Sequence, residues 1–294
     1  MTRPFYIVDV FSRRPYAGNQ LAVVMNADGM SGETMLRVAA EINYSETTFV
    51  ASHSTQDGAF NVRIFTPARE LAFAGHPLLG TAWAIRHHRT LQDDSTIKLN
   101  IPAGQIPVTF EAASEGGEIG WFVAPPVSLG PICSPSLFAS ALGISVADID
   151  TTSPIQKLSA GTAAVIVPIC SLKALQQCRL DLHTMAPVVA QGLPPLVYLF
   201  CRETYDPEND LCARFFFEAH GMREDPASGN AAAFLGRYFL EHRVLLSTDL
   251  HLRIEQGYAV NRPSLVYLHA SALDKAHVIK VGGHVAPVVR GELL

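Results

Sequence analysis

A chain of 294 residues, 48% hydrophobic and 17% charged, is long enough for two ordinary domains or one large one, and apolar enough to exclude an intrinsically disordered protein. Its 22 basic and 27 acidic residues give a formal net charge of −5. The basic residues form no stripe of the kind that lines a nucleic-acid groove, so we expect no nucleic-acid partner.

The sequence also indicates the cellular location of the protein. Its uninterrupted apolar runs are far shorter than the roughly 20 residues of a membrane-spanning helix. Asp9 lies within the stretch that would have to be the apolar part of a signal peptide. We therefore expect a soluble cytoplasmic protein with no membrane partner.

The first half of the chain alternates strand-like runs with two helical patterns. Residues 5–11 and 20–25 are β-type runs separated by a turn-rich segment, which indicates a hairpin. Apolar residues in 31–42 fall on one helical face, and the segment begins with a serine suited to cap it. A second helix is expected over about 77–89, because Pro77 suits a first turn. Further strands are expected at 46–50, 61–66, 97–101 and 106–110, followed by an exposed turn over 111–118.

The second half shows the same alternation. A helix over 134–142 begins with Ser-Pro and is followed by Gly143, which are start and stop signals. Further helices are expected over 182–191 and about 230–242. Strands are expected at 163–169, 196–202, 213–218, 252–255, 265–269, 277–281 and 285–289.

Strands outnumber helices and do not alternate with them regularly, which predicts an α+β fold rather than a βαβ fold. The sequence also contains a weak internal repeat. Segments 73–77 and 225–230 each follow a strand and each open a helix with small residues. This pairing predicts two similar lobes, each offering one helix N-terminus to a shared cleft.

The two small-residue turns are candidate anion sites. Gly75 in Ala-Gly-His-Pro lets the backbone approach a ligand, and the helix behind it offers unpaired N–H groups. The alternative is a simple turn with a capping histidine. The second turn, Asp225-Pro-Ala-Ser-Gly-Asn, could bind an anion in the same way. The alternative is that Asp225 or Ser228 is simply the N-cap of the helix.

Glu46 is a candidate acid–base group. It stands where the helix 31–42 gives way to a strand that should be buried. A carboxylate removed from water is costly unless it is paired or protonated, and desolvation suits it to general acid–base chemistry. The alternative is a solvated glutamate at the end of a loop.

Metal and nucleotide sites are not indicated. The histidines are scattered, and GxGxxG, GxxxxGK and GxSxG motifs do not occur, so we expect no metal and no cofactor. The cysteines lack a close CxxC pair, which argues against disulfides and zinc. Most lie in apolar stretches and are expected to be small buried hydrophobic residues: Cys133, Cys170, Cys178, Cys201 and Cys212.

Six segments resemble the PhzF-like family of phenazine-biosynthesis isomerases, and together they span nearly the whole chain. The most specific are Asn-Tyr-Ser-Glu46-Thr-Thr-Phe, Glu70-Leu-Ala-Phe-Ala-Gly-His-Pro and Glu-Asp225-Pro-Ala-Ser-Gly-Asn. The others are Val8-Asp-Val-Phe with the later Gly-Asn19, and 255–264 together with 282–288.

The resemblance implies a fold like that of diaminopimelate epimerase. Each of two lobes would be a mostly antiparallel sheet wrapped around a central helix, with the active site between the lobes. The first lobe would comprise residues 1–115, joined by the last strand at about 285–294, and the second lobe residues 116–284. A homodimer is also implied.

The resemblance further implies a cofactor-free isomerase that moves a proton on a small acidic metabolite, as trans-2,3-dihydro-3-hydroxyanthranilate isomerase does. Glu46 would carry the proton, and His76 and Asp225 would assist it. The groups that hold the substrate would be Asn19, Ser45, Gly75, Ser228, Gly229 and Asn230. Phenazine-pathway members usually carry Thr-Gly-Ser where this chain has Ser-Gly-Asn, so contacts to the substrate can differ there.

Two alternatives remain beside this interpretation. The first is an amino-acid racemase or epimerase of the same fold, which would place a cysteine before the glycine of each turn. Ala74 and Ser228 occupy these positions, which disfavours two-thiol chemistry. The second is a non-catalytic protein that binds a small molecule, which would not require Glu46, His76 and Asp225 together.

Overall fold

The computed structural model describes residues 2–91, 94–217, 224–273 and 276–294. The chain divides into two compact units. Unit 1 consists of Met1–Val123 and Gly282–Leu294, and unit 2 of Ala124–Val281. The segment 282–294 therefore belongs to the same unit as the N-terminal part of the chain.

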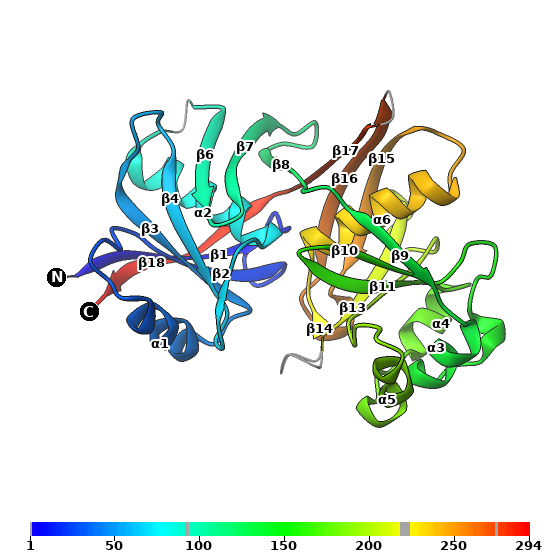
Figure 1. Ribbon diagram of the computed structural model, residues 1–294. Helices are drawn as coiled ribbons and strands as arrows, with labels where there is room; N and C mark the ends of the chain where they lie inside the picture. Colours follow the sequence, from blue (N-terminus) through cyan, green and yellow to red (C-terminus); the bar gives the residue numbers. More distant parts are fainter. Residues whose placement is uncertain (1, 92–93, 218–223, 274–275) are drawn as a thin grey trace. The chain divides into compact units, whose positions relative to one another are not determined.

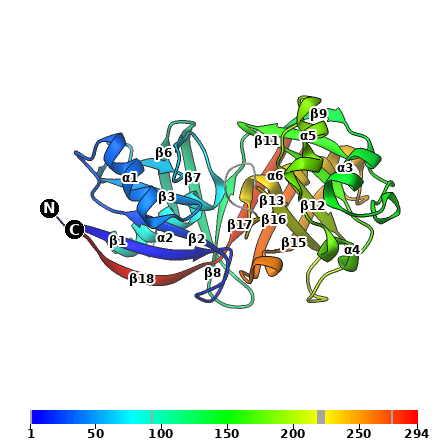
Figure 2. The ribbon, with the colours of Figure 1, turned by 90° about the horizontal axis from the view of Figure 1, so that it is seen from below.

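Unit 1 is built on a sheet whose strands pair in the order β18-β1-β2-β3-β4-β6-β7-β8. Two of these pairings, β2–β3 and β4–β6, are parallel, and the other five are antiparallel. The two-residue strand β5 pairs with β4. Figure 2 shows β1 and β18 running side by side. The strands are β1 (Arg3–Val10), β2 (Asn19–Val24), β3 (Glu46–Ser54), β4 (Phe60–Phe65), β5 (Glu70–Leu71), β6 (Thr96–Ile101), β7 (Gly104–Ala112), β8 (Glu118–Val123) and β18 (Val285–Leu293).

The sheet of unit 1 wraps around helix α2 (Gly75–Arg89), which contacts β1, β2, β3, β6, β7, β8 and β18 (Figure 1). Almost every residue from Gly75 to Arg86 is buried, as expected for a helix that is apolar on all sides. A methyl group on Gly80 would lie 2.6 Å from Leu21 Cδ2. The absence of a side chain there lets the helix lie close against β2. Helix α1 (Gly32–Ile42) connects the parallel strands β2 and β3, with Ser31 as its N-cap.

Unit 2 repeats this arrangement. Its strands pair in the order β9-β10-β11-β12-β13-β15-β16, with β11–β12 and β13–β15 parallel and the others antiparallel. The same succession of parallel and antiparallel pairings runs from β18 to β7 in unit 1. The two-residue strand β14 pairs with β13 as β5 pairs with β4. The strands are β9 (Ser128–Ile132), β10 (Gln156–Ala160), β11 (Thr162–Pro168), β12 (Val197–Cys201), β13 (Leu211–Phe216), β14 (Glu224–Asp225), β15 (Asp249–Gln256), β16 (Ser264–Leu273) and β17 (Ala276–Gly283).

Helix α6 (Gly229–His242) is the counterpart of α2 in unit 2 and packs on β16, β10 and β11. Helices α3 (Pro135–Leu142), α4 (Leu172–Gln177) and α5 (Leu182–Ala190) share a second apolar core with residues of β11, β12 and β13. Short 3-10 turns occur at η1 (Val146–Asp148) and η3 (Tyr258–Val260).

The predicted fold class is confirmed: the chain is mixed α and β, with few helices and mostly antiparallel strands. The hairpin at 5–25 and the helix start near Gly229 agree with the sequence patterns, whereas α2 begins at Gly75, before the expected start at about 77. The expected turn over 111–118 is shorter, because Glu111 and Ala112 extend β7. Residue 218, at the end of the expected strand 213–218, lies outside the described residues.

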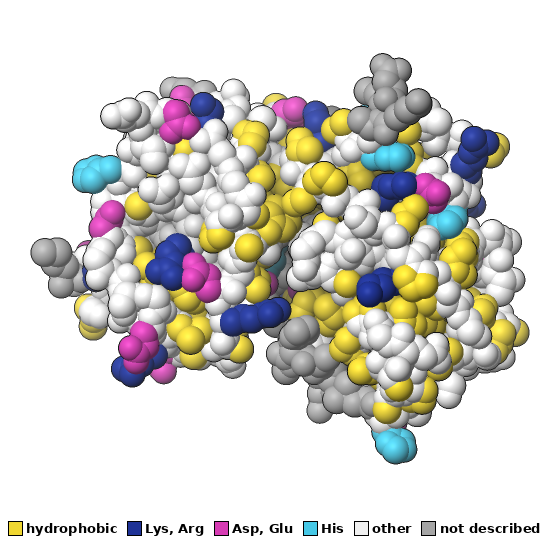
Figure 3. Space-filling view, viewed as in Figure 1, with side chains coloured by type: hydrophobic (Ala, Val, Ile, Leu, Met, Phe, Trp, Pro, Cys, Tyr) yellow, Lys and Arg dark blue, Asp and Glu magenta, His cyan; other side chains and the backbone are white. Residues whose placement is uncertain are grey.

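The described surface carries charges of both signs. Several Lys and Arg side chains lie next to Asp or Glu on the face that Figure 3 shows. Two ion pairs, Arg37–Glu33 and Arg237–Glu241, join residues one helical turn apart. Among the described residues, every helix is too short or too polar to cross a membrane.

Candidate active site

Glu46 is the first residue of β3 and lies beside Leu21 of the parallel strand β2. Only 16% of its side chain is exposed. Its Oε2 lies 3.5 Å from Nε2 of His76, whose side chain is 6% exposed. The carboxylate is therefore held inside unit 1 rather than solvated at the end of a loop.

His76 is the second residue of α2, and Pro77 follows it in the first helical turn. Burial lowers the pKa of His76 to about 3, and a backbone hydrogen bond with Gln20 opposes this shift only in part. The imidazole is therefore neutral near pH 7, so its contact with Glu46 is not an ion pair. A neutral imidazole has one donor and one acceptor nitrogen. At 3.5 Å the contact is longer than an ordinary hydrogen bond.

Two polar side chains continue the contact between Glu46 and His76. Asn19, the first residue of β2, is buried, and its Nδ2 lies 3.4 Å from Nδ1 of His76. Ser45 donates a hydrogen bond from Oγ to Oδ1 of Asn19 at 3.0 Å. Four of the site residues expected from the sequence therefore form one connected group in unit 1.

Gly75 completes this group as the first residue of α2. The N-cap is Ala74, whose methyl group cannot accept a hydrogen bond from the first turn. Such a helix start is electrostatically suited to a bound anion. The alternative of a capping histidine does not apply, since His76 lies inside the helix.

The remaining expected residues form a second group in unit 2. Asp225 ends β14 and is 9% exposed. Ser228 is the N-cap of α6 and accepts a hydrogen bond from the backbone N–H of Ala231 at 3.2 Å. Gly229 and Asn230 form the first turn of that helix. Ser228 thus has the structural role of a cap, and Asp225 does not.

Comparison with known proteins decides the family. The family model described as phenazine biosynthesis-like protein (PhzC-PhzF) matches residues 8–291. The chain belongs to this family. It is 32% identical over 290 residues to trans-2,3-dihydro-3-hydroxyanthranilate isomerase of Pseudomonas aeruginosa, which covers 98% of each chain. An uncharacterized isomerase of Pasteurella multocida is 32% identical over 292 residues, covering 98% of this chain and 93% of that one.

Solved structures agree with this assignment. The PhzF-family protein of Bacillus anthracis matches with a TM-score of 0.90 and 26% identity, covering 100% of this chain and 99% of that one. A hydroxyproline epimerase of Agrobacterium vitis matches with a TM-score of 0.62 at 10% identity, covering 99% and 91%, which shows a shared fold alone. This PhzF-family chain is an isomerase, similar to the dihydro-hydroxyanthranilate isomerases.

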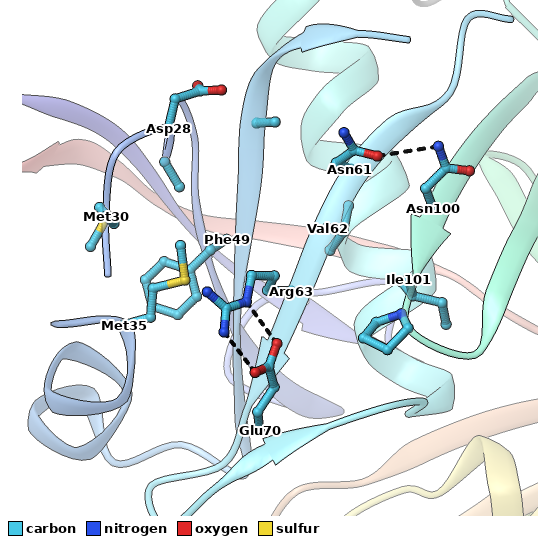
Figure 4. Close-up of a pocket in the computed structure, with 13 residues that line it drawn as sticks. Asp28, Met30, Met35, Phe49, Asn61, Val62, Arg63, Glu70, Asn100 and Ile101 are labelled. Atoms are coloured by element: carbon cyan, nitrogen blue, oxygen red, sulfur yellow. Dashed lines mark hydrogen bonds and ion pairs between the residues drawn. The ribbon is translucent and has the colours of Figure 1, made fainter. Parts of the chain in front are cut away.

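A hollow of about 510 Å³ in unit 1 of this PhzF-family chain lies apart from the expected site residues, none of which lines it. Figure 4 shows Arg63 and Glu70 on its wall, joined by two hydrogen bonds of 2.7 and 2.6 Å, with Met35 and Phe49 nearby. Asp28 also lines it. Because the charges of Arg63 and Glu70 offset one another, this hollow is a poor site for an acidic substrate.

The positions of the cysteines and of the possible metal ligands bear on two kinds of chemistry. The prediction of buried cysteines holds for Cys133, Cys178, Cys201 and Cys212, whereas Cys170 is exposed. Burial raises the pKa of Cys178 to about 11 and that of Cys201 to about 12, so these thiols are poor nucleophiles. Within the described ranges, His, Cys, Asp and Glu side chains form no group of three or more that could hold a metal ion.

The sequence patterns assigned no role to the buried polar residues that contact Glu224 and Asp225. Arg214 makes two hydrogen bonds to Glu224, at 3.0 and 2.7 Å, and also donates to the carbonyls of Leu175 and Cys178. Gln256 donates to the carbonyl of Asp225. In the sequence, only the family-typical segments 224–230 and 255–264 pointed to this region.

Proposed function

We propose that this chain is an isomerase that moves a proton between two carbons of a small carboxylate-bearing substrate, with Glu46 as the general acid–base group. The substrate class is that of trans-2,3-dihydro-3-hydroxyanthranilate. The observation that carries the proposal is the mostly buried Glu46 carboxylate, 3.5 Å from the neutral His76.

The chemistry needs only a positioned base and a conjugated substrate. A substrate C–H bond breaks, its proton passes to the Glu46 carboxylate, and its electron pair enters the neighbouring π system. The acidic proton on Glu46 exchanges with water, and Glu46 then delivers a proton to a different carbon, which forms the isomer and regenerates the carboxylate. No electron is gained or lost by the protein, so we propose that no metal or organic cofactor takes part.

The neutral state of His76 supports this role for Glu46. A protonated imidazole would neutralise the carboxylate and weaken it as a base. A neutral imidazole can orient one carboxylate oxygen and leave the other for the substrate.

The remaining residues are proposed to bind the substrate and orient it. The start of α2 at Gly75 and that of α6 at Gly229 and Asn230 would hold the carboxylate, as helix N-termini hold anions. Asn19, Ser45 and Ser228 would contact the substrate, and Asp225 would assist proton transfer. These roles rest on the match to the family motifs. We further propose a cytoplasmic homodimer, which light scattering would test by a mass near twice 31.8 kDa.

The test is turnover in heavy water. Purified protein is incubated with trans-2,3-dihydro-3-hydroxyanthranilate in D₂O, with EDTA in a parallel sample, and followed by NMR. We expect an isomer carrying deuterium at the newly protonated carbon, equally in both samples. Loss of turnover in EDTA, restored by a divalent ion, would contradict a metal-free reaction.

A protein that binds this substrate without isomerising it or exchanging its hydrogens would be a binding protein for it. Deuterium at the α-carbon of an amino acid, with loss of chirality, would favour the racemase or epimerase alternative instead.

A further inference from the structure

The turn that contains Asp225 is hydrogen-bonded to a buried side-chain amide. Gln256, the last residue of β15, is fully buried, and its Nε2 donates a hydrogen bond of 2.8 Å to the backbone carbonyl of Asp225. Its Oε1 accepts a hydrogen bond of 3.3 Å from the hydroxyl of Tyr198. Tyr198 therefore fixes which way the amide points, and the amide fixes the carbonyl of Asp225.

The turn needs such an anchor because its strand is very short. Among the described residues, Glu224 and Asp225 of β14 pair with β13, opposite Phe216 and Phe215. Pro226 follows, and since proline has no N–H group it cannot continue the ladder. The side chain of Gln256 thus holds the carbonyl at the point where strand pairing ends.

The neighbours of Gln256 in the sequence let it reach this position. Gly257 has φ +82°, and a methyl group on it would lie 2.6 Å from the carbonyl oxygen of Pro226. Only a glycine permits this close approach. Glu255, 1% exposed, accepts hydrogen bonds of 2.8 Å from the backbone N–H groups of Tyr205 and Asp206. Three consecutive residues therefore tie the end of β15 to the 205–209 loop and to the Asp225 turn.

We propose that Gln256 is the positioning residue for Asp225 in the isomerase reaction, an inference that rests on the proposed role of Asp225. By holding the backbone of Asp225, Gln256 sets the direction in which the carboxyl group points. A displacement of about 1 Å in such a group can reduce a catalytic rate by about 10²-fold. Gln256 itself does not touch the substrate.

Unit 2 contains a matched control. Gln156 on β10 is also buried, at 6% exposure, and its Nε2 donates to the carbonyl of Gly130 at 2.9 Å. Its Oε1 lies 2.6 Å from Nε2 of His242. Replacing either glutamine by methionine removes two contacts of a buried side chain at nearly constant volume, but only Gln256 holds the Asp225 turn.

The experiment compares Gln256→Met with Gln156→Met by hydrogen–deuterium exchange and by turnover. We expect Gln256→Met to speed amide exchange in 227–231 about tenfold, the factor for one lost hydrogen bond. It should lower kcat by about 10- to 100-fold, with a smaller change in KM. Gln156→Met should leave both unchanged. Exchange in 227–231 that is unaltered by Gln256→Met, or altered equally by both variants, would overturn the proposal.

The variant Asp225→Asn separates this proposal from the role of Asp225 itself. If Gln256 acts through Asp225, adding Gln256→Met to Asp225→Asn should lower kcat by less than about twofold further. A full additional loss would overturn the proposal. Wild-type turnover in Asp225→Asn would instead contradict the role of Asp225, while the exchange result would still report whether Gln256 holds the turn. If Gln256→Met fails to fold, Gln256→Leu, which also cannot donate to the carbonyl, takes its place with the same expected outcomes.

Discussion

Replacing Glu46 by glutamine separates its chemistry from its packing. The amide has nearly the same volume, so no cavity forms, and it can still contact His76, which is neutral. Because a mostly buried carboxylate is replaced by a neutral group, we expect the free energy of unfolding to fall by less than about 1 kcal/mol, or to rise. Proton transfer is lost, since an amide does not accept a proton near neutral pH.

The expected loss in kcat follows from the role of the carboxylate. A positioned acid–base group contributes about 10²–10⁴ in rate, which corresponds to about 2.7–5.4 kcal/mol of transition-state stabilisation. Affinity for an unreactive substrate analogue should change less than threefold or so, because the helix starts and not Glu46 are assigned to bind the anion. Turnover and deuterium uptake in D₂O measure the first effect, and calorimetry with the analogue measures the second.

The matched control is Glu41→Gln, which removes an equal charge from an exposed position on α1. Its turnover should equal that of the wild type. Glu46→Gln with turnover within about threefold of the wild type would refute the assignment of Glu46 as the base. A Glu46→Gln protein that does not fold, measured by circular dichroism, would show that the carboxylate is a structural group.

Three further predictions concern stability. The pKa of His76 falls from 6.5 to about 3 on folding, so protons favour the unfolded chain below pH 6.5. Between pH 7 and 4.5 the free energy of unfolding, measured with urea, should therefore fall by about 2–3 kcal/mol more in the wild type than in His76→Gln. Equal losses in the two proteins would contradict this. Gly80→Ala should lower the free energy of unfolding by about 1–3 kcal/mol through overpacking. Gly291→Ala is the control, because a methyl group there meets nothing within 4 Å, and it should change the free energy little. Equal melting temperatures of the two variants would refute the packing argument. Glu224→Gln leaves a buried arginine without its countercharge and should cost about 3–5 kcal/mol in urea unfolding. Glu241→Gln, which removes an exposed carboxylate from the pair with Arg237, should cost less than about 1 kcal/mol, and similar losses in the two variants would show that burial is not decisive.

Local patterns in the sequence predicted most of the fold because its main elements are long enough to show a period. The helix at 31–42 could be read from its capping serine and its apolar face, and the central helices from their glycine-opened starts. The two-residue strands β5 and β14 could not, since two residues carry no periodic signal and depend on their partner strands. The same holds for the six-residue helix α4.

The candidate site was predictable only where a family motif supplied it. Glu46 and His76 are 30 positions apart, and no local rule brings them to 3.5 Å; the fold of β3 beside α2 does so. The neutrality of His76 also depends on complete burial, which a sequence does not show. Gln256 reaches a carbonyl 31 positions earlier through its side chain, and such contacts leave no pattern in the sequence.

The chain order of unit 1 has a consequence for folding during synthesis. Strand β1 pairs with β2 on one side and with β18 on the other, and β18 is translated only after the whole of unit 2. Unit 2 is continuous and can complete its sheet as soon as it has left the ribosome. Until β18 emerges, β1 presents an unpaired edge along eight residues, Arg3–Val10, all of which become half-buried or buried. The nascent protein is therefore most exposed to aggregation in the interval between the synthesis of β2 and that of β18, and chaperone binding should concentrate on that edge.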